Sequence, residues 1–281
     1  MTGATPTHDT HPGSITLPIP ARAGATYIVA APERLPADPP AQVAECLTAL
    51  PIAPGRAPVR VIVEEITSDD PRLAWAEEIL CCPDCSPGAE RLLGALMGCS
   101  REHYAVTCTA PTGWPPVHLW AAARAVDTLA ELTGGIRLDP DVPRLLPVPW
   151  RPVPATGPET FVAGDWLWPS IGLEERGHTL LTTGMTRFGL PELGADGLDA
   201  DQVHPGIRLL DRLARSLIRR LFTHLAANPA DTVLTLPAEL PISGSDGPPT
   251  VRLRHDRAAL RGGTDLLTVL IGPAPPHGPA S

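Results

Sequence analysis

The chain contains no lysine: all 22 of its basic side chains are arginine, and Asn228 is its only asparagine. The absence of lysine excludes every mechanism that needs a Schiff-base lysine or the lysine of a P-loop. There are also 36 prolines among the 281 residues. Together these features indicate the codon bias of a GC-rich genome, and we attach no function to them.

Several signatures of known chemistry and of targeting are also missing. The sequence contains no G-x-S-x-G, no dinucleotide-binding glycine motif, no H-E-x-x-H and no set of kinase motifs. No apolar run approaches the length of a membrane span, and the polar first residues do not resemble a signal peptide. A net charge of −9 argues against non-specific binding to nucleic acid and against a polybasic membrane contact. We therefore expect a cytoplasmic protein with neither nucleic acid nor membrane as a partner.

The patterning of apolar residues indicates an α+β fold with mixed sheets and packed helices. Strands and helices alternate in the first half, which is compatible with a split β-α-β arrangement there. The predicted strands are 26–31, 59–66, 104–109, 161–168, 179–183, 232–236, 250–255 and 266–271. The predicted helices are 41–50, 72–80, 87–97, 117–132 and 205–227, with Pro205 in the first turn of the last one. Residues 139–146 are expected to form a turn and a short helical turn.

The composition changes most sharply at residues 147–158, PVPWRPVPATGP, which predict a stiff extended connector. On that basis the N-terminal α/β half would run from 16 to 146 and the C-terminal α+β half from 159 to 271. Residues 1–15 and 272–281 are small, polar or proline-rich and are expected to be disordered tails.

A cysteine-rich segment offers a candidate metal site. Cys82 and Cys85 form a C-x-x-C, and Cys99 with His103 forms a second pair at helical spacing. Two such chelating pairs are what a structural zinc site requires. Two other readings stay open, namely a redox C-x-x-C, because a helix is predicted to begin just after Cys85, and small buried side chains. The expected cofactor is accordingly none, or one structural zinc ion.

Four carboxylates lie close together at the end of the predicted strand 59–66, namely Glu64, Glu65, Asp69 and Asp70. Such a group could bind a hard cation. The alternative is a strand end followed by a helix start, where acidic side chains are favoured by the helix dipole.

The stretch that organises the second half is residues 178–193, HTLLTTGMTRFGLPEL. A strand ends at Gly184, and Gly184 and Gly189 then bracket a short turn because glycine tolerates positive φ. One interpretation makes this a binding loop, with Met185, Arg187, Phe188 and Glu192 as the contact residues and Glu192 on a constrained loop. The other makes it a structural corner with Phe188 as a core side chain.

The residues Thr183, Gly184, Met185, Phe188, Gly189, Pro191 and Glu192 resemble the signature turn of a bacterial domain-of-unknown-function family, Thr-x-Gly-Met-x-x-Phe-Gly-x-Pro-Glu, in a chain of actinobacterial type. In that family a strand leads into this turn and a long helix follows. The resemblance covers mainly 160–227 and, more faintly, 103–146. It implies a related fold and a partner-binding role of the kind that small bacterial immunity or accessory domains play, and it implies no activity.

The sequence thus favours a non-enzymatic binding or accessory protein that docks an unidentified protein partner through the 184–193 loop and the arginine-bearing helix 205–227. The alternative is a zinc-binding domain or a metal-dependent enzyme that uses Cys82, Cys85, Cys99 and His103. A binding protein predicts an exposed patch near Phe188, whereas an enzyme predicts a deep pocket with convergent polar groups.

Overall fold

The computed structural model describes residues 13–35, 59–67, 69–73, 100–142, 144–146, 152, 154–241, 250–256 and 265–270. The chain forms two compact units. Unit 1 comprises Met1–Ile19, Pro169–Thr186 and Leu190–Ser281, and unit 2 comprises Pro20–Trp168 and Arg187–Gly189. Within the described ranges, no helix combines the length and the apolar character needed to cross a bilayer.

Unit 2 is built on a five-stranded sheet in the order β3-β4-β2-β5-β6, in which every pair of neighbours is antiparallel. β4 and β5 lie on either side of β2, and the helix α4 connects them along the chain. The strands are β2 (Arg22–Ala31), β3 (Arg60–Ile66), β4 (Glu102–Pro111), β5 (Ile136–Asp139) and β6 (Arg144–Leu145).

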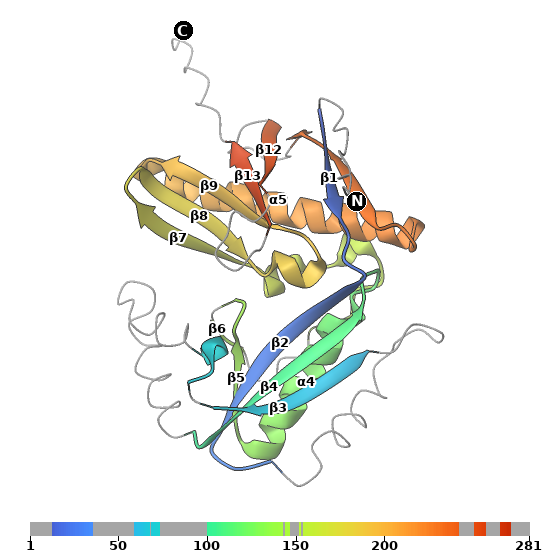
Figure 1. Ribbon diagram of the computed structural model, residues 1–281, viewed down its shortest axis with the longest axis vertical. Coiled ribbons are helices and arrows are strands. Elements are labelled where there is room, and N and C mark those ends of the chain that lie inside the picture. Colours follow the sequence, from blue (N-terminus) through green and yellow to red (C-terminus); the bar gives the residue numbers. More distant parts are fainter. Residues whose placement is uncertain are drawn as a thin grey trace, which may run out of the picture. The chain divides into compact units, whose positions relative to one another are not determined.

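The helix α4 (Val117–Thr133) packs along β2 and β4 (Figure 1). It ends at Gly134, whose φ of 63° is a left-handed conformation that glycine adopts without steric cost. Every residue of β2 from Tyr27 to Ala31 is buried. Because successive side chains of a strand point to opposite faces, this part of the sheet is covered on both faces.

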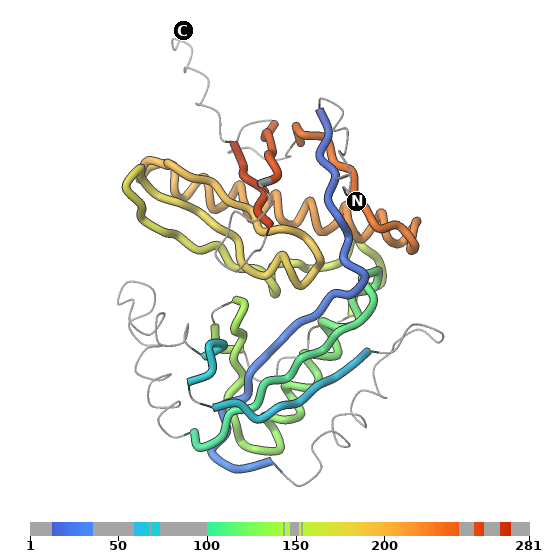
Figure 2. The backbone as a smooth tube through the Cα atoms, in the orientation of Figure 1, coloured from blue at the N-terminus to red at the C-terminus, as the bar shows by residue number. Residues whose placement is uncertain are grey.

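Unit 1 contains a six-stranded sheet in the order β11-β12-β13-β9-β8-β7 and a two-stranded sheet, β1-β10. The pair β13 and β9 is parallel, whereas the pairs β1-β10, β11-β12, β12-β13 and β8-β9 are antiparallel. The strands are β1 (Ser14–Pro18), β7 (Trp168–Glu174), β8 (Gly177–Thr183), β9 (Glu192–Leu198), β10 (Val233–Pro237), β11 (Glu239–Pro241), β12 (Thr250–Asp256) and β13 (Leu266–Leu270). The tube in Figure 2 follows β7, β8 and β9 side by side.

The long helix α5 (Ala200–Ala227) packs on β8 and β9. Its apolar stripe is buried and includes Leu210, Leu217 and Leu221. The helix begins with a capping box, in which the side chains of Asp199 and Gln202 satisfy backbone N–H groups at its N-terminus.

Much of the predicted α+β architecture is confirmed. The strands expected at 26–31, 59–66, 104–109, 179–183, 232–236, 250–255 and 266–271 all correspond to observed strands, and the helix at 117–132 corresponds to α4. The predicted helices 41–50 and 87–97, and most of 72–80, lie outside the described residues, as do the tail 272–281 and most of 1–15. Residues 147–158, the predicted connector, fall within the range of unit 2, whose end is at Trp168.

Four local predictions are wrong. Residues 161–168 contain the 3-10 helix η2 (Ala163–Trp166), and of the predicted strand only Trp168 is in a strand, as the first residue of β7; Trp166 is buried and Trp168 is 47% exposed. Residues 139–146 contain parts of β5 and β6, held by sheet hydrogen bonds. The long helix begins at Ala200 because of its capping box, which leaves Pro205 inside it. Ser14, predicted to lie in a tail, begins β1 and pairs with β10.

Candidate functional site

The turn after β8 is organised by the carboxyl group of Glu192, which is the first residue of β9 and so lies on a strand rather than on a loop. Its Oε1 accepts hydrogen bonds from the backbone N–H groups of Gly184 (3.0 Å) and Thr186 (3.2 Å), and its Oε2 accepts one from the Thr182 hydroxyl (2.8 Å). The Thr182 hydroxyl in turn accepts the backbone N–H of Leu193 at 2.8 Å. This Glu192 cluster, formed by Thr182, Gly184, Thr186 and Glu192, fixes the path of the turn within unit 1.

Burial raises the pKa of Glu192 to about 7, against the opposing effect of the hydrogen bonds from Thr182 and the backbone of the turn. The side chain is 6% exposed. An ionised carboxylate loses its hydration there, and the surrounding donors only partly replace it. Either protonation state fits the geometry, because the Thr182 hydroxyl can donate to a carboxylate or accept from a carboxylic acid.

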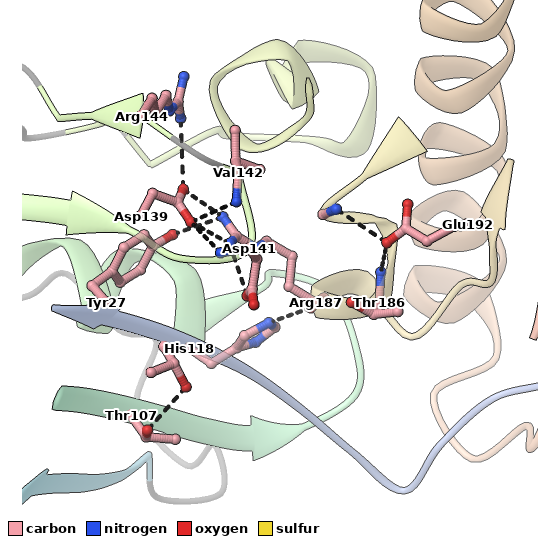
Figure 3. Close-up of polar contacts among 12 residues, drawn as sticks. Tyr27, Thr107, His118, Asp139, Asp141, Val142, Arg144, Thr186, Arg187 and Glu192 are labelled. Atoms are coloured by element: carbon pink, nitrogen blue, oxygen red, sulfur yellow. Dashed lines mark hydrogen bonds and ion pairs between the residues drawn. The ribbon is translucent and has the colours of Figure 1, made fainter. Parts of the chain in front are cut away.

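The next residues of the turn, Arg187–Gly189, belong to unit 2, where Arg187 is completely buried. Its guanidinium forms a bidentate pair with Asp139, at 2.7 Å and 3.0 Å, and also donates to Asp141 at 2.9 Å and to the Tyr27 hydroxyl at 3.1 Å. Figure 3 shows these side chains converging. We call Tyr27, Asp139, Asp141 and Arg187 the Arg187 cluster.

Burial acts to lower the pKa of Arg187, but its acidic neighbours outweigh this effect and raise the pKa well above the ordinary value. For Tyr27 burial has the opposite effect and is the main cause of its raised pKa. The guanidinium is therefore a permanent buried cation that Asp139 must compensate.

His118, in the first turn of α4, contacts the backbone at Arg187, in the turn that follows β8. Its Nε2 donates to the carbonyl of Arg187 at 2.8 Å, and burial lowers its pKa to about 4 (Figure 3). His118 is 2% exposed and therefore neutral at physiological pH. Phe188 lies next to Arg187 and stacks edge-to-face on Phe161, with ring centroids 5.8 Å apart.

The four residues predicted to contact a partner are thus all internal. Met185 is 0% exposed, Arg187 and Phe188 are 1% exposed, and Glu192 is 6% exposed. Their partners are the backbone and side chains of the protein itself, so the turn does not present an exposed patch at Phe188. In this conformation the four side chains hold the turn in place.

The predicted metal ligands Cys82, Cys85 and Cys99 lie outside the described residues. His103 is described: it lies in β4, is 7% exposed, and its Nε2 is buried with no hydrogen-bond partner among the described residues. Burial lowers its pKa, which favours the neutral imidazole that ligates metals. No cluster of three or more His, Cys, Asp or Glu side chains suited to a metal occurs in the described part of the chain.

The acidic group at the end of β3 is largely paired with arginine. Arg72 forms ion pairs with Glu64 and with Asp70, and Arg34 forms one with Glu65. This arrangement matches a strand end followed by a helix start, since residues 71–73 are helical.

One charged surface feature stands out in unit 1. Arg208, Arg212, Arg215 and Arg219 are spaced by four, three and four residues along α5. This spacing places them on one face of a helix, over about 16 Å of its length. The buried residues Leu210, Leu217 and Leu221 lie on the opposite face. We call these four residues the arginine ridge.

The ridge carries more positive charge than its surroundings neutralise. Arg208, Arg215 and Arg219 are exposed. Arg212 is half-buried, and its buried Nε has no hydrogen-bond partner in the described part of the chain. Arg215 pairs with Asp211 at 2.9 Å. Among the side chains that the structure describes, no carboxylate pairs with Arg208, Arg212 or Arg219.

No signal in the sequence identifies the partners of Arg187. Tyr27, Asp139 and Asp141 precede it by 160, 48 and 46 residues, and no motif joins them. The spacing of the arginine ridge, in contrast, is visible in the sequence once the helix and its buried face are fixed.

Comparison with known proteins identified no relative: no protein-family model, no curated protein and no solved structure matches this chain.

Proposed function

We propose that this is a non-enzymatic binding protein that docks an acidic segment of a protein partner along the arginine ridge of α5. The observation that carries the proposal is the arrangement of the ridge, in which four arginines share an outward face and three of them have no carboxylate partner among the described residues. Guanidinium groups favour planar, bidentate contacts with carboxylates, so an exposed row of them suits a row of Asp or Glu side chains.

The charge of the whole chain favours a protein partner over a nucleic acid. The net charge is −9, so the overall field repels a polyanion that carries one charge per about 1.7 Å. A short acidic segment meets mainly the ridge, where Arg208–Arg220 contains five arginines and one aspartate. Charge complementarity of this kind also steers association and makes it dependent on salt.

The buried turn has a different role in this proposal from the one expected from the sequence. The Glu192 cluster fixes the end of β8 and the start of β9, and β9 runs directly into α5 at Asp199. The turn therefore supports the strands on which α5 packs, and the ridge makes the contact.

A synthetic helical peptide with glutamates at the spacing of the ridge provides the probe, and its binding is measured by fluorescence anisotropy. Reversing two exposed ridge charges, Arg208→Glu with Arg219→Glu, should weaken binding by about tenfold or more, since each exposed ion pair contributes up to about 1 kcal/mol and reversal adds repulsion. The matched control, Arg60→Glu with Arg101→Glu, changes the net charge equally at exposed sites of unit 2 and should leave binding nearly unchanged.

Equal weakening in both variants would refute the ridge as the docking surface. If a single-stranded oligonucleotide of the same charge bound more tightly than the peptide, the partner would be a nucleic acid rather than a protein. Both variants should keep their melting temperature, because surface substitutions usually change stability by less than about 0.5 kcal/mol.

A structural zinc ion remains a second candidate, favoured by the buried, unbonded Nε2 of His103. The residues that would hold it with His103 are Cys82, Cys85 and Cys99, whose spacing suits two chelating pairs. Elemental analysis of the tag-free protein tests this: one zinc per chain, lost on His103→Phe and on Cys82→Ser, is expected. A wild-type chain without zinc after growth in zinc-supplemented medium would remove the candidate.

A further inference from the structure

The strand β7 lies at one edge of the six-stranded sheet of unit 1, with β8 as its neighbour in the described sheet (Figure 1). The outer side of an edge strand carries backbone N–H and C=O groups that are free to pair with another strand. Natural edges are usually protected by charged side chains, proline or a covering segment. In β7 the proline, Pro169, lies near the start and the acidic residue, Glu174, at the end, so the middle of the strand is left without either.

That middle part is apolar and exposed. Ile171 is 54% exposed and Leu173 is 77% exposed, the highest value among the large hydrophobic side chains described. Because they are two residues apart, they lie on the same face of the sheet. A two-residue apolar patch on an open edge is a feature that monomeric proteins tend to avoid.

The register of β7 on β8 shows which face this is. A Cβ at Gly172 would lie 3.9 Å from the Cβ of Thr179, so these two residues are opposite each other on one face. Ile171 therefore lies beside Leu180, on the other face. Leu180 is buried against α5, where its Cδ1 lies 2.6 Å from the position of a Cβ on Gly206. Ile171 and Leu173 thus lie on the same face of the sheet as α5, but outside the part of that face that α5 buries.

We propose that β7 pairs antiparallel with β7 of a second copy of this chain, with Gly172 at the two-fold axis. In this register Ile171 of one copy lies opposite Leu173 of the partner subunit, and Leu173 lies opposite Ile171 of the partner subunit. The four side chains form one apolar cluster across the axis, and cross-strand apolar pairs of this kind stabilise sheets. The two sheets then continue as one. This inference does not depend on the proposed function of the arginine ridge.

Among the three registers that place the axis at Ile171, Gly172 or Leu173, the one at Gly172 pairs Ile171 with Leu173 on both sides of the axis. With Gly172 on the axis, Glu174 lies opposite Ser170 and Glu175 opposite Pro169, so no two carboxylates face each other. Moving the axis to Ile171 would place Leu173 opposite Pro169, which has no N–H to donate. Moving it to Leu173 would place Ile171 opposite Glu175, an apolar side chain beside a charge.

The interface is small, because a strand of seven residues is well below the length needed for an interface of about 1,200 Å². We therefore expect weak, concentration-dependent association of the full chain, with a dissociation constant of about 1–100 µM. Sedimentation velocity over this concentration range measures it.

Charge-reversed pairs of variants test the register. The cationic variant carries Ile171→Lys and Leu173→Lys, and the anionic variant carries Ile171→Glu and Leu173→Glu. Each variant alone should dissociate at least about tenfold more readily than the wild type, because like charges then face each other across the axis. A mixture of the two should form a heterodimer, because each lysine then lies opposite a glutamate. The control variant, Leu132→Lys with Val162→Lys, alters exposed apolar residues of unit 2 and should dimerise as the wild type does.

Three results would overturn the proposal. The first is a wild-type chain that is monomeric at 100 µM, and the second is a dimer that the β7 variants leave unchanged. The third is a mixture of the cationic and anionic variants that stays monomeric although both are folded by circular dichroism.

Discussion

The replacement Arg187→Met removes a fully buried cation of unit 2 while keeping most of the volume of the side chain. In the wild type, Arg187 and Asp139 both have fully buried side chains, and they make two hydrogen bonds of 2.7 Å and 3.0 Å. In the variant Asp139 keeps the backbone N–H groups of Asp141 at 3.2 Å and Val142 at 3.1 Å and an ion pair with Arg144 at 4.0 Å, but it loses its bidentate partner. The Tyr27 hydroxyl loses its donor as well.

Removing one partner of a buried ion pair costs about 3–5 kcal/mol, and here Asp139 is left with the more distant Arg144 as its counter-charge. With a urea m-value of about 2 kcal/mol/M for a unit of this size, the midpoint of unfolding should fall by about 1.5–2.5 M. All six tryptophans lie in the range Pro20–Trp168, within unit 2. Tryptophan fluorescence therefore reports on the unit that contains the Arg187 cluster.

Arg34→Met provides the matched control within the same unit. Arg34 also pairs with a carboxylate, Glu65 at 3.3 Å, but the two side chains are 74% and 53% exposed. An exposed ion pair contributes about 1 kcal/mol or less, so this variant should unfold close to the wild-type midpoint. If Arg187→Met cost no more than Arg34→Met, the Arg187 cluster would not be the compensated buried pair described here, and the reasoning would fail.

Three further predictions concern the turn and its surroundings. Because the pKa of Glu192 is raised to about 7 from 4.5, the folded chain binds this proton more tightly, and the contribution to stability is complete below pH 4.5 and lost as the pH rises through 7. The protection free energy of amides in 184–193, obtained from exchange rates corrected for the intrinsic effect of pH, should fall over that window by up to about 3 kcal/mol, and the same fall in Glu192→Gln would contradict this. Because the pKa of His118 is lowered from 6.5 to about 4, its contribution to stability is complete above pH 6.5 and lost as the pH falls to 4. The free energy of unfolding should therefore fall on acidification by up to about 3 kcal/mol, which lowers the urea midpoint measured by tryptophan fluorescence by about 1.5 M, and His118→Gln should reduce this pH dependence. Gly189 has φ of +81°, and a Cβ there would lie 2.8 Å from Pro20, so Gly189→Ala should lower the free energy of unfolding by about 2–4 kcal/mol in the same assay. Gly134 has φ of +63° and its nearest neighbour would be 3.9 Å away, so Gly134→Ala should cost about 1–2 kcal/mol. Equal losses of stability would show that no steric contact is made at Gly189.

Local chemistry in the sequence was enough to place most of the elements. The β-branched runs TYIVAA and VRVIVEEI are strands, and the helix at 117–132 ends at a glycine pair as expected. Gly184 and Gly189 have φ of +102° and +81°, which is the conformation that their place in the turn predicted. In each case the side chain, or its absence in glycine, determines the conformation of its own backbone, so the conformation can be predicted without knowing which distant residues lie nearby.

Predictions failed where distant residues decide the structure. The segment around Trp166 has the composition of a strand but forms a 3-10 helix, and the short strands β5 and β6 exist only because β2 supplies a partner edge. Glu192 begins β9, which pairs with β8 and with β13, the latter some 75 residues further along the chain.

The sequence by itself determined the α+β composition, the strand and the two positive-φ glycines of the central turn, and the helical spacing of the arginine ridge. Only the tertiary structure decided that Arg187 and Glu192 are buried, because their compensation comes from Asp139 and Tyr27 in one case and from backbone N–H groups in the other. A charged side chain on a glycine-rich turn is expected in solvent, and it becomes internal only where the fold provides enough hydrogen-bond partners to replace the water that it loses.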